Sequence, residues 1–327
     1  MPNLVGIGNS QAPTNAMLGG LAYQDSVGEI DLEKIKAKTS DTAVAPFGIF
    51  VYDTSKDSDG GAWRKTTQST SWYDEGVSQF RGNRKEFPSI AVIVVESDRV
   101  VIYDGDDPNL PMWMIFKNTG EIGAASNMLS AGASGNDNTC VHALNGEMVV
   151  GTKRSIGGGE GLFRINFISE RAKIHRTLGS GYTASLWNSN IRDRNHINTN
   201  SSNMASNTVG YTKEVADSGS MDNTSDIQDI RDLQVNDVSM VVERNAPLDE
   251  ISGLPIPTVG AATTTAVNIF LPYVGNRNTG PITIKLKPED ISAYDGIKAM
   301  ETIDFDEDGR CIWATRQTSN AYRNILL

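Results

Sequence analysis

Cysteine and positive charge are scarce in this chain. Its 327 residues contain two cysteines, and 29 lysines and arginines stand against 40 acidic residues, for a formal net charge of −11. Two cysteines give no disulfide framework. Nucleic-acid surfaces need clustered cations, and the longest basic cluster, Arg81 with Arg84 and Lys85, is too short to supply one. We therefore expect no specific nucleic-acid binding.

Membrane-spanning and secretory signals are also missing. No run approaches the roughly 18 apolar residues of a membrane span. The N-terminus has neither the basic start nor the apolar stretch of a signal peptide. We expect a soluble protein without membrane insertion, and the 39 % of hydrophobic residues is enough for a packed core.

Three stretches each read as a β-hairpin, with short β-branched runs on both sides of a polar turn. The turns are Ser97–Asp98, Asn145–Gly146 and Asp308–Gly309. Asn-Gly and Asp-Gly readily adopt the positive φ angles that a tight hairpin turn requires. The predicted strand pairs are Ser89–Glu96 with Arg99–Asp104, Thr139–Leu144 with Glu147–Thr152, and Thr302–Phe305 with Arg310–Thr315.

A further apolar strand follows each of the first two hairpins, so that each unit becomes a meander. These strands are Pro111–Lys117 and Gly161–Ile168. Equivalent positions in the two units are roughly 45–50 residues apart, a period typical of β-propeller repeats. Another unit is predicted before the last hairpin, with strands Pro257–Ala262, Ala266–Pro272 and Pro281–Leu286.

These units predict a mainly β fold, a propeller-like array of antiparallel meander blades in residues 46–327. One blade alone cannot bury both faces of its sheet, so neighbouring blades have to stack. An ordinary β-sandwich with uneven loops is the alternative interpretation. Between Thr183 and Asp237 the apolar pattern is lost, which predicts a polar insertion at about 183–237. Such a loop either meets a ligand or another subunit or is simply solvated.

Residues 1–45 are predicted to form an extended N-terminal arm outside this domain. They contain Pro2, Pro13 and a polar helix-like stretch, Glu29–Lys38, whose only strongly apolar interior residue is Ile35. No core can be built from such a segment. It is either a frayed terminus or an arm that becomes ordered against a partner.

Aromatic residues gather after the arm. Trp63 lies in the second strand, Ala62–Thr67, of a predicted hairpin whose first strand is Phe47–Tyr52, and Trp72 and Tyr73 follow closely. Aromatics at this spacing most often pack together in a small core. The same side chains can stack on carbohydrate, so Trp63, Trp72 and Tyr73 are the candidate binding residues.

No motif predicts catalysis or a bound cofactor. Gly146–Lys153 places its lysine one position too late for a phosphate-binding loop, and no helix follows Gly157–Gly161. The histidines, His142, His175 and His196, lack metal-ligand spacing. We therefore expect no catalytic residue, no metal and no cofactor.

Two further groups of residues have an ordinary structural interpretation. Asp304, Asp306 and Asp308 alternate and could offer oxygen ligands to calcium, but a hairpin tip with solvated carboxylates explains them as well. Cys140 shares a predicted strand face with His142. We expect the thiol to act as a small buried apolar group and the imidazole as a hydrogen-bonded core histidine.

Several segments resemble tail and tail-fibre proteins of marine bacteriophages, cyanophages in particular. The resemblance covers about half of the chain, and its first block is the most specific. That block consists of Gly48–Thr54, Asp59–Thr67 and Thr70–Tyr73; shorter matches are Leu18–Asp25, Asn145–Thr152 and Gly161–Phe167.

The resemblance implies a non-enzymatic virion protein located in a phage tail. Residues 1–45 would attach to other tail proteins, and a homo-oligomer would present the propeller portion to a host surface glycan or protein. Two structural roles are consistent with this resemblance: a tail fibre or adhesin, and a subunit of a nozzle ring that lines the DNA exit channel. A propeller carbohydrate-active enzyme is the alternative of another class, and it requires two carboxyl groups within roughly 5–10 Å.

Overall fold

Short β-branched runs joined by tight turns build this protein. The computed structural model is mainly β, with antiparallel sheets and few helical turns. No helix among the residues that it describes is long and apolar enough to cross a membrane. The described residues are 33–35, 37, 46–69, 82–96, 99–117, 136–154, 161–169, 171–175, 187–190, 230, 234–264, 266–272, 283–286, 297–306, 309, 311–317 and 322–326.

The first sheet is a four-stranded antiparallel meander in which each strand pairs with the next one in the chain. Its central strand β2 is buried along its whole length, as its sequence Ile-Ala-Val-Ile-Val-Val-Glu requires of a strand covered on both faces. The strands are β1 (Gly48–Asp53), β2 (Ile90–Glu96), β3 (Arg99–Asp104) and β4 (Met112–Lys117).

Three more meanders follow in chain order. The second sheet has five strands, the third has four and the fourth has three. The second sheet contains β5 (Asn136–Leu144), β6 (Glu147–Arg154), β7 (Leu162–Asn166), β8 (Arg171–His175) and β9 (Trp187–Asn190). The third contains β10 (Val235–Val241), β11 (Thr258–Thr263), β12 (Val267–Phe270) and β13 (Thr283–Leu286), and the fourth contains β14 (Ile297–Phe305), β15 (Cys311–Gln317) and β16 (Tyr322–Leu326).

The three predicted hairpins are confirmed. β2 pairs with β3, β5 with β6 and β14 with β15. In the turn between β5 and β6, Asn145 and Gly146 have φ angles of 52° and 74°. Gly309 has a φ of 79° in the turn before β15. The turn chemistry of the sequence thus fixes these pairings, although the turn at 97–98 lies outside the described residues.

The predicted hairpin between Phe47–Tyr52 and Ala62–Thr67 is wrong. β1 pairs with β2, and Ala62–Ser69 forms a 3₁₀ helix, η2. Part of the cause is local, because the Asp59 carboxylate accepts hydrogen bonds from the backbone N–H groups of Gly61 and Trp63 and so starts a helical turn. The other part is the packing of Trp63 against Phe87. Within the predicted polar insertion the structure places β9 and the start of β10, and residues 191–229 lie outside the described part.

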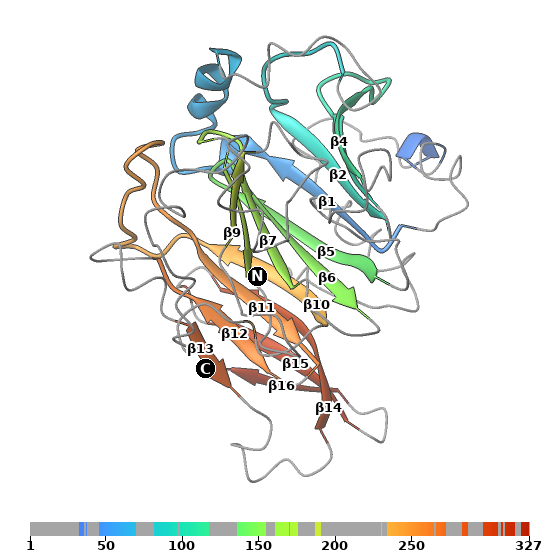
Figure 1. Cartoon of the computed structure of the whole chain (residues 1–327), viewed down its shortest axis with the longest axis vertical. Coiled ribbons are helices and arrows are strands. Elements are labelled where there is room, and N and C mark those ends of the chain that lie inside the picture. The colour runs from blue at the N-terminus through green and yellow to red at the C-terminus, as the bar shows by residue number, and fades with distance from the viewer. Residues whose placement is uncertain are drawn as a thin grey trace, which may run out of the picture.

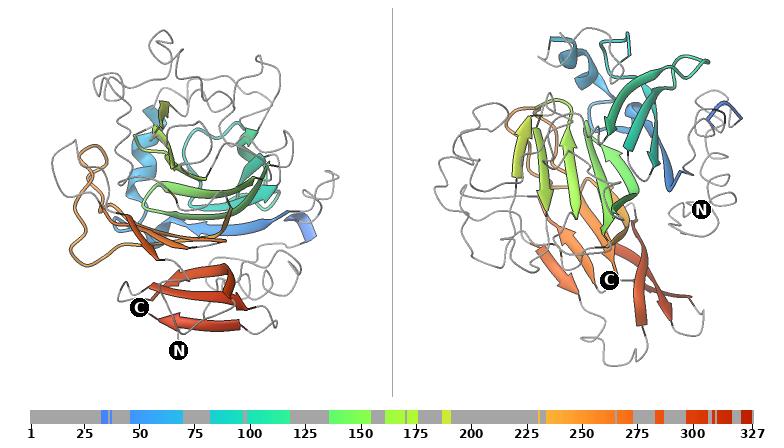
Figure 2. Two further views of the ribbon diagram at one scale, coloured as in Figure 1. Left: turned by 60° about the horizontal axis from the view of Figure 1, so that its bottom comes forward. Right: turned by 45° about the vertical axis from the view of Figure 1, so that its right-hand side comes forward.

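The first strands of successive sheets contact one another. β1 contacts β5, β5 contacts β10, and β10 contacts β14. Figures 1 and 2 show the four sheets following each other through the molecule in chain order, with the first sheet at the top of Figure 1 and the fourth at the bottom. Each sheet thus meets the next one in the chain along its leading strand.

The largest core cluster lies between the first and second sheets and centres on Phe87, which is fully buried. The Phe87 ring lies 4.7 Å from Trp113, 4.9 Å from Phe167, 5.1 Å from Trp63 and 5.8 Å from Tyr52, measured between ring centroids. Aromatic pairs at these distances add stability beyond the area that they bury. This cluster therefore joins the first two sheets.

The described residues of the predicted N-terminal arm contact the first sheet through Ile35, and Lys34 Nζ donates to the Pro108 carbonyl at 2.6 Å. Ile35 lies in a short helical segment and is 2 % exposed. It packs against Val92, Val94 and Val101 on the face of the first sheet that points away from the aromatic cluster. The expectation that this segment contributes to no core is therefore wrong at Ile35. One apolar side chain can be buried without a core of its own segment when it packs on the apolar face of a sheet.

Candidate functional site

The acidic loop that follows β1 is held by its own aspartates. Asp53 Oδ1 accepts hydrogen bonds from the backbone N and the hydroxyl of Ser55, at 3.1 and 2.6 Å. Asp59 binds the backbone N–H groups of Gly61 and Trp63 at 2.9 and 2.8 Å. Short aspartate side chains commonly bond to backbone two residues ahead. A sequence that predicts a long hairpin tip thus forms a compact turn.

Asp57 lies at the centre of this loop and is buried. Its carboxylate accepts hydrogen bonds from the Tyr52 hydroxyl at 2.6 Å, from Trp63 Nε1 at 2.7 Å and from the Asn145 backbone N at 2.8 Å. The Tyr52 oxygen in turn accepts from the Gly146 N–H at 2.8 Å. Burial raises the pKa of Asp57 and outweighs these hydrogen bonds, which lower it. The network ties the loop after β1 to the turn between β5 and β6.

Asp57→Asn is expected to lower the free energy of unfolding by about 2 kcal/mol, because an amide NH₂ placed against the Trp63 N–H leaves buried donors without an acceptor. Urea unfolding followed by tryptophan fluorescence measures the change. Asp107→Asn is the matched control, since Asp107 Oδ1 accepts the Asn109 N–H at 2.8 Å at an exposed site and an amide oxygen can do the same. Equal effects of the two variants would contradict a special role for Asp57.

The three candidate binding aromatics are not brought together on a described surface. Trp63 is 3 % exposed and lies in the aromatic core, with its indole N–H bonded to Asp57. Its ring is therefore not available to stack on a sugar, which agrees with the core interpretation of these aromatics. Trp72 and Tyr73 lie outside the described residues.

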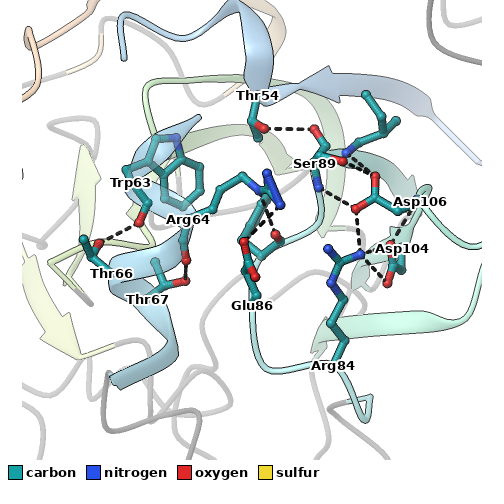
Figure 3. Close-up of polar contacts among 12 residues, drawn as sticks. Thr54, Trp63, Arg64, Thr66, Thr67, Arg84, Glu86, Ser89, Asp104 and Asp106 are labelled. Carbon is teal, nitrogen blue, oxygen red and sulfur yellow. Dashed lines mark hydrogen bonds and ion pairs between the residues drawn. The ribbon is translucent and has the colours of Figure 1, made fainter. Parts of the chain in front are cut away.

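A second polar cluster fixes the loops at the end of the first sheet (Figure 3). Arg84 Nη1 lies 2.7 Å from Asp104 Oδ1 and 2.7 Å from Asp106 Oδ2. Asp106 also accepts hydrogen bonds from the hydroxyl and the backbone N–H of Ser89 and from the N–H of Ile90. Burial raises the pKa of Asp106, but these hydrogen bonds outweigh it and the net shift is downward. Arg84, part of the basic cluster in the sequence, is thus an internal ion-pair partner.

Arg64, on η2, bridges to the same loop. Its Nε donates to the Phe87 carbonyl at 2.9 Å and its Nη2 lies 3.1 Å from Glu86 Oε1 (Figure 3). Trp113 Nε1 donates to the Glu86 carbonyl at 3.1 Å. These contacts hold Phe87 in the core, so the charged groups at this end of the sheet position a buried aromatic side chain.

The titratable groups of the inner strands are buried and engaged in packing. Cys140 is buried, and burial raises its thiol pKa. The His142 ring lies 4.5 Å from the Phe50 ring, and burial lowers its pKa to about 4. Its Nδ1 is buried without a hydrogen-bond partner in the described part of the chain, so the expected satisfied histidine is wrong at this atom. A thiol of raised pKa beside an uncharged imidazole does not form an activated nucleophile.

Asp304 is half-buried and lies near the buried carboxyl of Asp237, so it is not a solvated carboxylate of a hairpin tip. Asp237 and Asp304 lie on neighbouring strands β10 and β14, and the Asp237 carboxylate accepts the Ile303 N–H at 3.0 Å. Ser239 donates to Asp304 at 3.0 Å. Among the described residues no group of three or more His, Cys, Asp or Glu side chains could hold a metal ion. Asp308 lies outside the described residues.

A small hairpin between β10 and β11, residues 248–255, carries two exposed large apolar side chains and was not predicted from the sequence. We call it the tip hairpin. Leu248 and Pro255 form a bridge, and Asp249 N donates to the Leu254 carbonyl at 2.8 Å. Leu254 is buried in the core cluster that lies between the first and second sheets. Asn145 Nδ2 donates to the Pro255 carbonyl at 2.9 Å. The base of the tip hairpin is thus fixed to the body.

Leu248 and Ile251 project from this fixed base and are 62 % and 52 % exposed. The only signal for them in the sequence is a leucine and an isoleucine among proline, acidic residues and glycine, which is typical of many surface loops.

No protein-family model matches the chain, and a search of curated proteins finds no match.

Proposed function

We propose that this protein is a structural component of a bacteriophage tail, acting as a tail fibre or attachment protein that contacts the host surface. The resemblance of Gly48–Thr54 and the blocks that follow it to phage tail proteins is one support. The observation that carries the proposal is the contact of the leading strands β1, β5, β10 and β14 in chain order. Successive meanders packed in this way are the arrangement of blades in a propeller.

In this proposal each sheet is one blade of a propeller-like scaffold. A four-stranded meander with its first strand innermost is the repeating unit of such a fold, and the first and third sheets have that strand order. The scaffold role is supported by the way charged groups are used, since Arg64, Arg84 and Asp57 hold loops to the body. A scaffold of this kind carries exposed loops on a rigid frame.

Immunogold electron microscopy tests the tail role directly. An antibody raised against residues 46–327 is expected to label the tails of phage particles from the culture that yields the protein. Label that stays in the soluble fraction of lysed cells and is absent from particles would overturn the proposal, and hydrolysis of a host polysaccharide by the purified chain would favour the carbohydrate-active alternative.

The native mass separates the structural roles. Light scattering after size-exclusion chromatography is expected to give a trimer for a fibre or adhesin, whereas a six-fold or twelve-fold ring indicates a nozzle. A variant that lacks residues 1–30 keeps Ile35 on the first sheet and should keep this mass while losing its attachment to particles. Loss of the oligomer in this variant would assign the arm to subunit contacts instead.

A further inference from the structure

Three large apolar side chains in the described part of the chain are strongly exposed. Leu248 and Ile251 are 62 % and 52 % exposed on the tip hairpin, and Phe47, just before β1, is 44 % exposed. Single exposed apolar residues are ordinary on a protein surface. Two of them on one short hairpin, one at its base and one at its turn, are a better candidate for an interface, because a loop that is hydrogen-bonded to the body loses little entropy on binding.

The tip hairpin and the start of β1, which directly follows Phe47 in the chain, lie on opposite sides of the molecule. In Figure 1 the orange loop between β10 and β11 projects at the left edge, while β1 begins at the right and runs toward the upper left. The second panel of Figure 2, turned by 45°, keeps the loop and the start of β1 on opposite sides. A side chain on one surface therefore cannot cover the other within one copy.

The tip hairpin carries an exposed carboxylate, and the Phe47 end carries an ion pair between Arg99 and Glu96. Glu250 on the tip hairpin is exposed, and Asp249 beside it binds backbone N–H groups within the hairpin. Phe47 N donates to the Val95 carbonyl, so Phe47 lies at the end of the first sheet where Arg99 begins β3. The Arg99 side chain is 22 % exposed, with Nε bonded to Glu96. In the described part of the chain its terminal nitrogens have no acceptor, and they suit an incoming carboxylate.

We propose that the tip hairpin of one copy binds the Phe47 end of the first sheet of a second copy, with Leu248 and Ile251 against Phe47 and Glu250 beside Arg99. The inference deepens the proposed function and rests on it, because a repeated tail component needs a contact between its copies. The two surfaces are different and lie on opposite sides, so the contact is head to tail. Such contacts close into rings or continue into filaments.

Complementary variants test this pairing. L248S/I251S removes the apolar side chains of the tip hairpin, and Phe47→Ser removes the opposite surface. Because all three side chains are exposed, the fold should persist, and far-ultraviolet circular dichroism and the melting temperature check this. Each variant alone is expected to associate about 100-fold more weakly than the unmodified chain in sedimentation velocity. Asn245→Ser, an exposed polar change next to the hairpin, is the matched control and should leave association unchanged.

Mixing the two variants gives the decisive result. Each retains one intact surface, so an equimolar mixture is expected to form one-to-one dimers and nothing larger, while each variant alone stays monomeric. An oligomer that persists in both variants overturns this interface and leaves the tail role standing, because immunogold labelling tests that role separately. An unmodified chain that stays monomeric at high concentration overturns the interface as well.

Discussion

Replacing Phe87 by alanine is expected to lower the free energy of unfolding by about 4 kcal/mol, the largest effect of any single core substitution considered. Phe87 is fully buried and its ring contacts Tyr52, Trp63, Trp113 and Phe167. These partners come from β1, η2, β4 and the turn after β7. Removing the ring leaves a cavity where the first two sheets meet, and its lining cannot collapse because it is fixed from four directions.

Urea unfolding followed by the fluorescence of the tryptophans beside the cavity measures this loss. Phe87→Leu keeps most of the volume and should cost about 1.5 kcal/mol, and Phe47→Ser, at an exposed phenylalanine, should cost less than about 0.5 kcal/mol. A loss below about 2 kcal/mol for Phe87→Ala would show that the aromatic cluster does not join the sheets as described.

The second large effect is a pH dependence that comes from Asp237. Burial raises the pKa of this carboxyl to about 7 from an ordinary value of 3.8, because hydrogen bonds from Ile303 and Val238 only partly compensate for the loss of water. The folded state therefore holds the proton more tightly than the unfolded state. The stability that this provides is complete below about pH 4 and is lost as the pH rises to about 7, for a total of about 4 kcal/mol.

Asp237→Asn removes this titration. The unmodified protein loses about 4 kcal/mol of stability from this group between pH 4 and pH 8, and the variant does not. The free energy of unfolding of the variant minus that of the unmodified protein is therefore expected to increase by about 4 kcal/mol over this range, as measured by urea unfolding at a series of pH values. Asn245→Ser, an exposed polar change that removes no titratable group, should leave the pH profile unchanged. A difference between the Asp237 variant and the unmodified protein that does not depend on pH would contradict the buried, proton-binding carboxyl.

The local pairing of strands could be predicted from the sequence because its causes are local. Asn145 and Gly146 supply the positive φ angles of a two-residue turn, and the β-branched runs on either side have the length of strands. The pairings of β2 with β3 and of β14 with β15 follow from the same kind of signal. Such signals depend only on neighbouring residues, and the structure confirms them.

The loop after β1 shows where local reasoning fails. A run such as Ala62–Thr67, led by tryptophan, suits a strand as well as a helix, and what decides is the capping of its N-terminus by Asp59 and the burial of Trp63 against Phe87. β1 can pair with β2 because the intervening residues fold into turns. This choice depends on a partner that lies 24 residues farther along the chain.

The mainly β class and the antiparallel hairpins follow from turn residues and β-branched runs, and the net negative charge follows from composition; none of these depends on distant residues. In contrast, the burial of Trp63, the packing of Ile35 on the first sheet and the exposure of Leu248 and Ile251 follow from how distant segments pack. Burial depends on what the other sheets cover. Leu254 in the core and Leu248 on the tip hairpin are the same residue type, and only the packing of distant strands makes one buried and the other exposed.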